Sequence, residues 1–493
     1  MKKIAIVGAG LGGLSTAIRL AKSGFDVDIF EQNNEVGGKV SEILMGDYRF
    51  DTGPSVITLI DVINELFELA GADLSEQLDF IKIDPISRNI FYDGQHFDLY
   101  SNVDLLKSEY TRFTGIDPDQ INKYILKITN IYKLTADIFL HQPLHEYKKL
   151  IKEKKFPPLS DFLFIDAFRT MHDANKSYFI DEHIVQVFDR YATYNGSSPY
   201  LIPATLNIIA YVELILGSYY IKGGIHQLVK AIHGLARKVG VKIFLNTKVD
   251  EILHDGNQIK GIRIGKDTSY YDYVVANSDV VETFRTLLSG FPAMTKKMEK
   301  IEPSLSGMVF MWGINKTHEN LLHHNVFYSK DYKNEFVEIF DSKIMPTDPT
   351  IYLAITSKTE KNHAPLLSEN WFILINMPYI NENLKKEEFD LMRQRVLNKL
   401  KEFGYDIESN IEYESIITPY DLQNRYGANK GSIYGISSNS KFTAFKRHPN
   451  RSKLLKNLFF AGGSVHPGGG VPLVILSGKH VADLIISTES LNK

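Results

Sequence analysis

The hydrophobic pattern at the start of the chain predicts a strand, a helix and a second strand. Residues 3–7 (KIAIV) form a short β-branched run typical of a strand buried in a parallel sheet. Apolar residues then recur at helical spacing from Leu14 to Ala21, and Gly24 stands where a helix C-terminal cap belongs. Residues 26–30 (DVDIF) alternate as a second strand. The segment therefore predicts a βαβ unit.

Beyond this unit the pattern changes several times. Residues 60–220 are mainly helical in pattern and rich in Leu, Ile, Phe and Tyr, and residues 223–280 return to a helix followed by strands. Residues 300–440 alternate strand-like and helical runs, and residues 457–486 predict a strand, a glycine-rich turn and a closing helix. We expect an α/β fold, α+β overall.

The same changes of pattern suggest two interleaved domains. The first, Rossmann-like domain is expected to comprise residues 1–80, 221–295 and 441–493. The second, a domain of sheet plus helices, is expected to comprise residues 81–220 and 296–440.

No apolar segment is expected to span a membrane. The first residues resemble a secretory signal, but repeated glycines interrupt them and a strand, turn and helix explains them better. The apolar segment 201–217 carries Pro203, Asn207 and Glu213, unlike the run of about 20 apolar residues that a transmembrane helix needs. Peripheral membrane contact stays open.

The amino-acid composition excludes several classes of protein and several kinds of catalytic chemistry. The 493 residues are 44% hydrophobic and 23% charged, which excludes disordered, collagen-like and coiled-coil classes. A net charge of −3 gives no basic footprint, so no nucleic-acid partner is expected. The chain has no cysteine, which excludes disulfides, thiolate nucleophiles and cysteine-held metals or haem. Redox chemistry would then need a non-covalently bound cofactor or a residue other than cysteine, and no metal site is predicted.

A glycine motif follows the first strand and opens the first helix. Gly8 permits a tight turn, Gly10 lets the backbone approach a pyrophosphate, and Gly13 lets the helix and strand pack closely. The helix N-terminus adds free N–H groups and a partial positive charge. Glu31 closes the second strand 23 residues after Gly8, where a carboxylate can bind a ribose. An ordinary glycine turn is the alternative, but this context favours a dinucleotide site.

Two further segments resemble a flavoprotein pattern. Gly38 and Lys39 lie in EVGGKV, and residues 51–55 read DTGPS. Each could be an ordinary surface turn. Their spacing from Glu31 nevertheless resembles the flavoproteins with two dinucleotide-binding domains, which include amine oxidases and carotenoid desaturases. That resemblance implies FAD rather than a nicotinamide cofactor.

The C-terminal segment 457–486 resembles the terminal signature of the bacterial phytoene desaturase family. In that family a strand, a glycine pair and an HPG segment lead to a helix whose N-terminus lies beneath the isoalloxazine. Residues 189–204 and 222–232 also resemble family segments, so the likeness covers nearly the whole chain. His466 could be a general base, but the sequence supplies no partner carboxylate, and we assign it no catalytic role.

The resemblance implies a set of FAD-binding residues, whereas the catalytic residues stay unknown. Val249 and Asn277 are carried over to the adenine end of the cofactor, although both could be ordinary strand-end residues. The full set is Gly8, Gly10, Gly12, Gly13, Glu31, Gly38, Lys39, Pro54, Ser55, Val56, Val249, Asn277, Gly463, Gly470, Val471 and Pro472.

Within the family, the ending HPGGGVPLV resembles the 1-hydroxycarotenoid 3,4-desaturases more than phytoene desaturases, in which the segment reads HPGAGIPGV. Gly469 and Leu473 carry this difference. The likeness implies a carotenoid-biosynthesis enzyme that introduces a C-3,4 double bond into a (1'-hydroxylated) carotenoid by hydride transfer to flavin. The alternatives are phytoene desaturase-type activity, a flavin amine or porphyrinogen oxidase, and a non-enzymatic isoprenoid-binding protein of the same fold, as in Rab GDP-dissociation inhibitors.

A carotenoid substrate implies a tunnel lined by apolar side chains that opens at a membrane surface. Residues 146–168 place five lysines before a run with several aromatics, which suits an anionic membrane, although a solvated helix end next to a core segment explains them equally well. No second strand-linked glycine motif suggests NAD(P)H, which leaves oxygen or a membrane quinone as electron acceptor. We expect a cytoplasmic protein peripherally attached to the inner face of the cell membrane.

Overall fold

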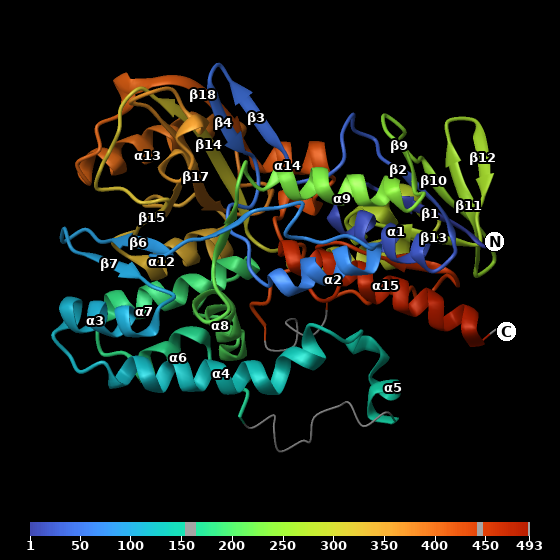
Figure 1. Cartoon of the computed structure of the whole chain (residues 1–493), viewed down its shortest axis with the longest axis horizontal. Coiled ribbons are helices and arrows are strands. Elements are labelled where there is room, and N and C mark those ends of the chain that lie inside the picture. Colours follow the sequence, from blue (N-terminus) through green and yellow to red (C-terminus); the bar gives the residue numbers. More distant parts are fainter. Residues whose placement is uncertain (153–163, 441–446, 492–493) are drawn as a thin grey trace.

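The computed structural model describes residues 1–152, 164–440 and 447–491. Helices surround its two largest sheets, and both described chain ends lie beside the parallel one (Figure 1). The predicted βαβ unit is present as β1 (Lys3–Val7), α1 (Leu11–Lys22) and β2 (Asp26–Phe30). The α/β fold class is therefore confirmed.

The parallel sheet has five strands, and its strand order reverses direction at β1. The order is β9 (Lys242–Phe244), β2, β1, β13 (Tyr273–Ala276) and β19 (Leu458–Phe460). Ligands bind α/β sheets at such a switch point, beyond the carboxyl ends of the strands.

Successive side chains of β1 point to opposite faces of this sheet, and each face is covered by a separate core. Ile4 and Ile6 point into the core formed with the helices, whereas Ala5 and Val7 point into a second core on the opposite face. The helical face carries α1, α2 (Ile60–Ala70), α9 (His226–Lys238) and α15 (Val471–Leu491). The other core includes residues of β10 (Glu251–Asp255), β11 (Gln258–Ile264), α10 (Val280–Glu282) and α11 (Pro292–Glu299); β12 (Asp267–Tyr270) pairs with β11.

A mixed sheet of seven strands forms the other half. Its strands, in order, are β18 (Ile411–Ile417), β14 (Ser306–Ile314), β17 (Glu369–Met377), β16 (Ile351–Ile355), β15 (His324–Phe327), β6 (Ser87–Ile90) and β7 (His96–Leu99). One face packs on α13 (Phe389–Glu402), and the other meets the hairpin of β3 (Glu42–Met45) and β4 (Tyr48–Asp51). The remaining helices here are α12 (Tyr332–Phe336) and α14 (Pro419–Tyr426).

The prediction of a mainly helical segment from 60 to 220 was wrong for residues 80–99. These residues form β5 (Phe80–Lys82), β6 and β7, and β5 pairs with β8 (Tyr219–Ile221). The strands are short and partly polar, so their pairing with distant strands outweighs a weak local pattern. The expected helices follow, below the sheets in Figure 1: α3 (Val103–Thr114), α4 (Asp119–Phe139), α5 (Tyr147–Lys152), α6 (Met171–Tyr178), α7 (Glu182–Asp189) and α8 (Ile208–Leu214).

The predicted domain boundaries stay a prediction. Every strand of the parallel sheet falls within residues 1–80, 221–295 and 441–493, and every strand of the seven-stranded sheet falls within 81–220 and 296–440.

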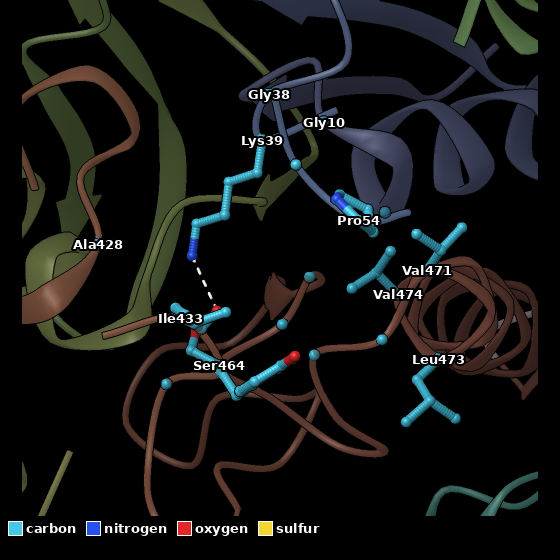
Figure 2. A pocket seen from close by; sticks show the side chains of 18 of the residues that line it. Gly10, Gly38, Lys39, Pro54, Ala428, Ile433, Ser464, Val471, Leu473 and Val474 are labelled. Atoms are coloured by element: carbon cyan, nitrogen blue, oxygen red, sulfur yellow. Dashed lines mark hydrogen bonds between the residues drawn. The ribbon is translucent and has the colours of Figure 1, made fainter. Parts of the chain in front are cut away.

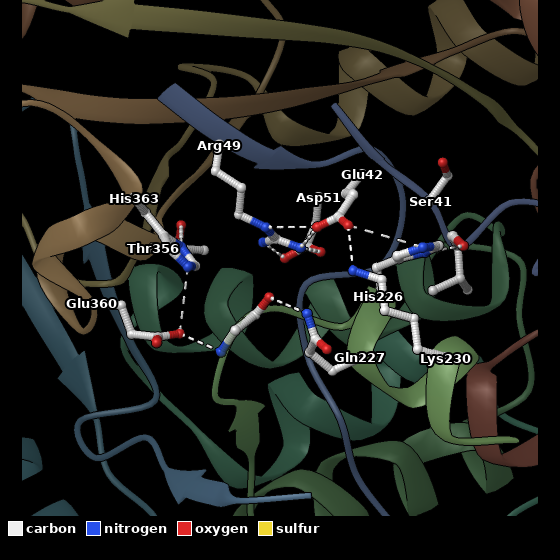
Figure 3. A network of polar contacts seen from close by, with 12 residues as sticks. Ser41, Glu42, Arg49, Asp51, His226, Gln227, Lys230, Thr356, Glu360 and His363 are labelled. Atoms are coloured by element: carbon white, nitrogen blue, oxygen red, sulfur yellow. Dashed lines mark hydrogen bonds and ion pairs between the residues drawn. The ribbon is translucent and has the colours of Figure 1, made fainter. Parts of the chain in front are cut away.

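A partly buried ionic network joins the two halves (Figure 3). Both terminal nitrogens of Arg49 donate to Asp51, at 2.6 and 2.8 Å, and Arg49 also reaches Glu42. Lys230 on α9 donates to Glu42 at 2.6 Å, while Asn370 on β17 donates to the carbonyl of Arg49 at 2.6 Å. The β3–β4 hairpin is therefore tied at once to the helix layer of one half and to the sheet of the other.

One described helix is long and apolar enough to cross a membrane. It is Val471–Ser490 within α15, and 61% of its apolar window is buried inside the molecule. The helix packs against α1 and α2, and this core position accounts for its composition.

Candidate active site

The carboxyl ends of the parallel strands meet at a cavity of about 900 Å³. Gly8 and Gly10 follow β1, Glu31 follows β2, Asn277 follows β13 and Gly462 follows β19. All five residues line the cavity, which lies at the switch point of the sheet.

Every predicted cofactor residue except Gly13 lines this one cavity. Gly13 lies behind the turn, where a Cβ atom would come within 2.3 Å of the carbonyl oxygen of Gly8. That position agrees with close helix–strand packing and not with ligand contact. The lining includes Gly8, Gly10, Gly12, Glu31, Gly38, Lys39, Pro54, Ser55, Val56, Val249, Asn277, Gly463, Gly470, Val471 and Pro472.

The glycine turn is packed around the side chain of Asn277. A Cβ on Gly10 would lie 2.9 Å from Asn277 Nδ2, and a Cβ on Gly12 would lie 2.7 Å from Asn277 Oδ1. Nδ2 donates to the carbonyl of Gly8 at 3.2 Å, while Oδ1 is buried with no partner among the described residues. Helix α1 has no acidic residue in its first turn and no side-chain cap. Its free N–H groups and the bare turn fit a pyrophosphate.

Glu31 has a structural task as well as a place in the cavity wall. Its carboxylate accepts hydrogen bonds from the backbone N–H of Ala9 at 2.8 Å and from Asn33, and the residue is 6% exposed. A carboxylate has about four acceptor sites, so Glu31 can hold the turn and still accept from a ribose hydroxyl.

Lys39 places a positive charge in the cavity without an ion-pair partner among the described residues. Figure 2 shows the side chain reaching from the Gly38 loop to Ile433, whose carbonyl oxygen lies 3.0 Å from Nζ. Burial lowers the pKa of Lys39 to about 8, although Asp279 opposes the shift. Burial also raises the pKa of Asp279 to about 6. An anionic ligand would compensate the lysine charge.

A second part of the cavity is apolar. It lies between the helical layer, α4 and α8, and the inner face of the seven-stranded sheet, β14 and β17. An elongated apolar ligand could lie in this part with one end at the glycine turn. Its side chains include Phe139, Leu140, Leu206, Ile208, Ile209, Val212, Leu305, Val309, Phe372 and Leu374.

The structure also brings Ser55, one of the predicted cofactor residues, together with two polar residues that the sequence analysis missed, Tyr352 and His324. The hydroxyls of Ser55 and Tyr352 are 2.5 Å apart, and Tyr352 Oη lies 2.9 Å from Nδ1 of His324. Burial, with smaller effects from neighbouring His323 and Arg190, holds the pKa of His324 well below its usual value, so the ring is neutral. These residues come from separate segments, and no local spacing could have grouped them.

His466 has the structural role that its missing carboxylate partner suggested. Its Nε2 lies 2.9 Å from the backbone carbonyl of Gln142, just beyond α4. Burial holds the pKa of His466 well below its usual value, so the ring is neutral and anchors the segment after α4.

Comparisons with known proteins agree with this geometry. A family model described as "Flavin containing amine oxidoreductase" matches residues 11–486. The chain is 38% identical to a 1-hydroxycarotenoid 3,4-desaturase of Flavobacterium sp. (strain P99-3), over 99% of this chain and 100% of that one. It is 36% identical to a 4,4'-diaponeurosporene oxygenase of Staphylococcus haemolyticus (strain JCSC1435), over 99% and 98%. An oxidoreductase structure from Methanosarcina mazei matches with TM-score 0.65 and 15% identity, over 98% and 100%.

The chain therefore belongs to the family of flavin-containing amine oxidoreductases, and it is an FAD-dependent enzyme. Its sequence relatives lie among the carotenoid-type desaturases and oxygenases of that family. The alternative of a non-enzymatic isoprenoid-binding protein is accordingly set aside.

Replacing Gly12 by alanine should prevent normal FAD binding. The new Cβ would fall 2.7 Å from Asn277 Oδ1 and 2.9 Å from the Gly462 nitrogen, so the turn must open. Gly234→Ala in α9 is the control, because no atom lies within 4 Å of its Cβ and alanine favours helix by about 1 kcal/mol. FAD titration of both apoproteins measures the effect. Equal affinities would show that the turn does not hold the cofactor.

Lys39→Met should make apoprotein stability depend differently on pH. Below pH 8 the wild-type lysine is charged in folded and unfolded chains, and its burial costs roughly 3 kcal/mol. Between about pH 8 and 10.5 the unfolded chain holds the proton more tightly, so wild-type stability rises with pH and this cost disappears. Urea unfolding should therefore find the variant's relative advantage larger at pH 7 than at about pH 10. Lys260→Met, on the surface, should give no such trend; a trend shared by both variants would contradict the assignment.

Proposed function

We propose that the protein introduces a double bond at the 3,4 position of a carotenoid, in the same end group that carries its tertiary hydroxyl, in carotenoid biosynthesis. The supporting observation is the continuity of one cavity, with the glycine turn at one end and an apolar region between α8 and the seven-stranded sheet. An extended polyene needs such a region beside the cofactor. The relative named 1-hydroxycarotenoid 3,4-desaturase supports the specific reaction.

Two residues near the start of α15 support the same substrate class. A Cβ on Gly469 would lie 2.9 Å from Cδ1 of Tyr434, so glycine lets this ring pack against the loop. Leu473 lines the cavity, where a glycine would leave additional space. Together with Val471, these are the positions at which the terminal segment departs from the phytoene desaturase pattern.

When bound, FAD supplies the hydride acceptor for dehydrogenation of an unactivated C–H bond. The apolar walls orient the chain and exclude water from the reacting carbons. Ser55, Tyr352 and His324 offer a route for the proton that the substrate also loses. Tyr352 Oη can pass a proton to the neutral Nδ1 of His324 while it accepts one from Ser55 Oγ.

We further propose that the helical layer attaches peripherally to the inner face of the cell membrane and admits the substrate there. Phe139 and Leu144 line the cavity, and the α5 side chains that follow include exposed Tyr147 and Ile151. Aromatic and aliphatic side chains beside lysines suit an anionic lipid surface. Part of the predicted docking segment 146–168, residues 153–163, lies outside the described residues.

An oxygenase reaction on a carotenoid is the second candidate. It is supported by relatives named 4,4'-diaponeurosporene oxygenase and 4,4'-diapolycopene oxygenase, which are 36% and 35% identical to this chain. The product distinguishes the two reactions, because desaturation removes two hydrogens and oxygenation adds oxygen.

Anaerobic mixing of the holoprotein with a 1-hydroxylated acyclic carotenoid in anionic vesicles tests the proposal. The flavin absorption should bleach while the carotenoid spectrum moves to longer wavelength, and mass spectrometry should find a product lacking two hydrogens. Readmitted oxygen or an added quinone should restore the flavin band. A product that gains oxygen under air would favour the second candidate, and an unchanged carotenoid would contradict both.

Tyr352→Phe should lower kcat by about 100-fold while FAD affinity stays the same. The ring remains, but the hydroxyl that joins Ser55 to His324 is lost, and general acid–base groups typically contribute at least this factor. Tyr124→Phe is the matched control, since its buried hydroxyl lies on α4 and contacts Asn207 instead. If the Tyr352→Phe variant had the kcat of the wild type, the Tyr352 hydroxyl would not belong to the proton route.

A further inference from the structure

Arg190 is a charged side chain in the wall of an otherwise largely apolar region. It begins the short helix η3 (Arg190–Asn195), directly after α7. Its guanidinium carbon lies 5.4 Å from the ring centroids of both Tyr194 and Tyr352. Among the described residues it makes no side-chain hydrogen bond and no ion pair, although it lines the cavity.

The aromatic contacts stabilise the charge but leave the donors unused. A guanidinium has five N–H donors and stays protonated, and ring faces attract its charge without offering an oxygen acceptor. Glu213 is buried nearby, but one of its oxygens already accepts from Tyr194 at 2.9 Å, and neither oxygen lies within ion-pair distance of Arg190. Unsatisfied donors in a water-poor site are unfavourable, so a ligand oxygen would relieve a real cost.

We propose that Arg190 forms a subsite for the oxygen atom at the end of the substrate, with a tertiary hydroxyl as the acceptor. This inference rests on the proposed function and adds the residue that recognises the hydroxylated end. Arg190 stacks on Tyr352, whose hydroxyl contacts Ser55 beside the predicted cofactor position. An oxygen on C-1 lies only a few bonds from the C-3,4 bond. The reaction therefore requires the hydroxyl to be bound close to the cofactor, and Arg190 lies at that end of the cavity.

The subsite also solves a positioning problem. A polyene presents nearly the same apolar surface along its length, so apolar walls bind it without deciding which carbons reach the cofactor. A polar end group is the feature that distinguishes one register from the others. A charge-assisted hydrogen bond from Arg190 to that group fixes the register and selects hydroxylated over plain hydrocarbon ends.

The test compares two carotenoids that differ only in the hydroxyl on C-1, at the same end as the C-3,4 bond, using wild-type holoprotein, Arg190→Met and Arg190→Lys. Substrate affinity is measured by quenching of flavin fluorescence, and kcat/KM is measured separately. Arg112→Gln is the control, because this exposed arginine on α3 pairs with Glu109 away from the cavity. FAD content and Tm are recorded for every variant.

Arg190→Met should weaken affinity and kcat/KM for the hydroxylated carotenoid by about 10- to 100-fold, the usual effect of losing a charged hydrogen bond. The values for the hydrocarbon should change by less than about twofold. Arg190→Lys should recover part of the preference for the hydroxylated carotenoid. Lysine keeps the positive charge but lacks the planar guanidinium with its paired N–H donors. Arg112→Gln should match wild type.

Several results would overturn the subsite. Equal losses for both carotenoids would give Arg190 a general structural role, and a changed FAD affinity would assign it to the cofactor. A wild-type protein that binds and desaturates both carotenoids equally would refute the subsite and leave the desaturase proposal intact. A wild-type protein that neither binds nor desaturates either carotenoid would refute the proposed function itself.

Discussion

The site depends on one constraint, the close packing of glycine backbone around the side chain of Asn277. The side chain stands between the turns that follow β1, β13 and β19, and it holds Gly8 by a hydrogen bond. Gly12 and Gly462 lie so close that a Cβ on either would come within 3.0 Å of Asn277 Oδ1. Three strand ends can meet only because these positions have no side chain. The same absence leaves the N-terminus of α1 open to a ligand, so packing and binding share one cause.

The sequence predicted best what lies close together along the chain. The βαβ unit, the glycine turn and Glu31 fall within one short segment, where periodicity and spacing carry the signal directly. Strands β6 and β7 were missed because β7 pairs, among the described strands, only with β6, and β6 in turn joins the sheet by long-range pairing with β15. Arg190 and Tyr352 were missed for a related reason. Neither residue stands out in its own segment. They come into contact only when η3 packs against the seven-stranded sheet.

Charge in the cavity couples folding to ligand binding. Lys39 and Arg447 both donate to backbone carbonyls, which satisfy some of their hydrogen bonds but carry no full negative charge. Burial lowers the pKa of Arg447 to about 10, a measure of how strongly the site disfavours an unbalanced cation. A ligand with negative charge relieves that cost only in the folded protein. Cofactor binding should therefore stabilise the fold by more than its contact area suggests.

The arrangement divides recognition between two kinds of wall. The strand ends present glycine backbone, helix N-termini and a carboxylate, all suited to a nucleotide. The fold that brings them together is shared with a structure only 15% identical. The helical layer contributes Phe139, Ile209 and Val212, whose apolar contact gives affinity but little positional preference. For the proposed polyene substrate, specificity for one bond must then come from the few polar groups among them. A charged side chain in such a wall is costly unless a partner atom compensates it, so the few exceptions to the apolar lining are the places where register can be set.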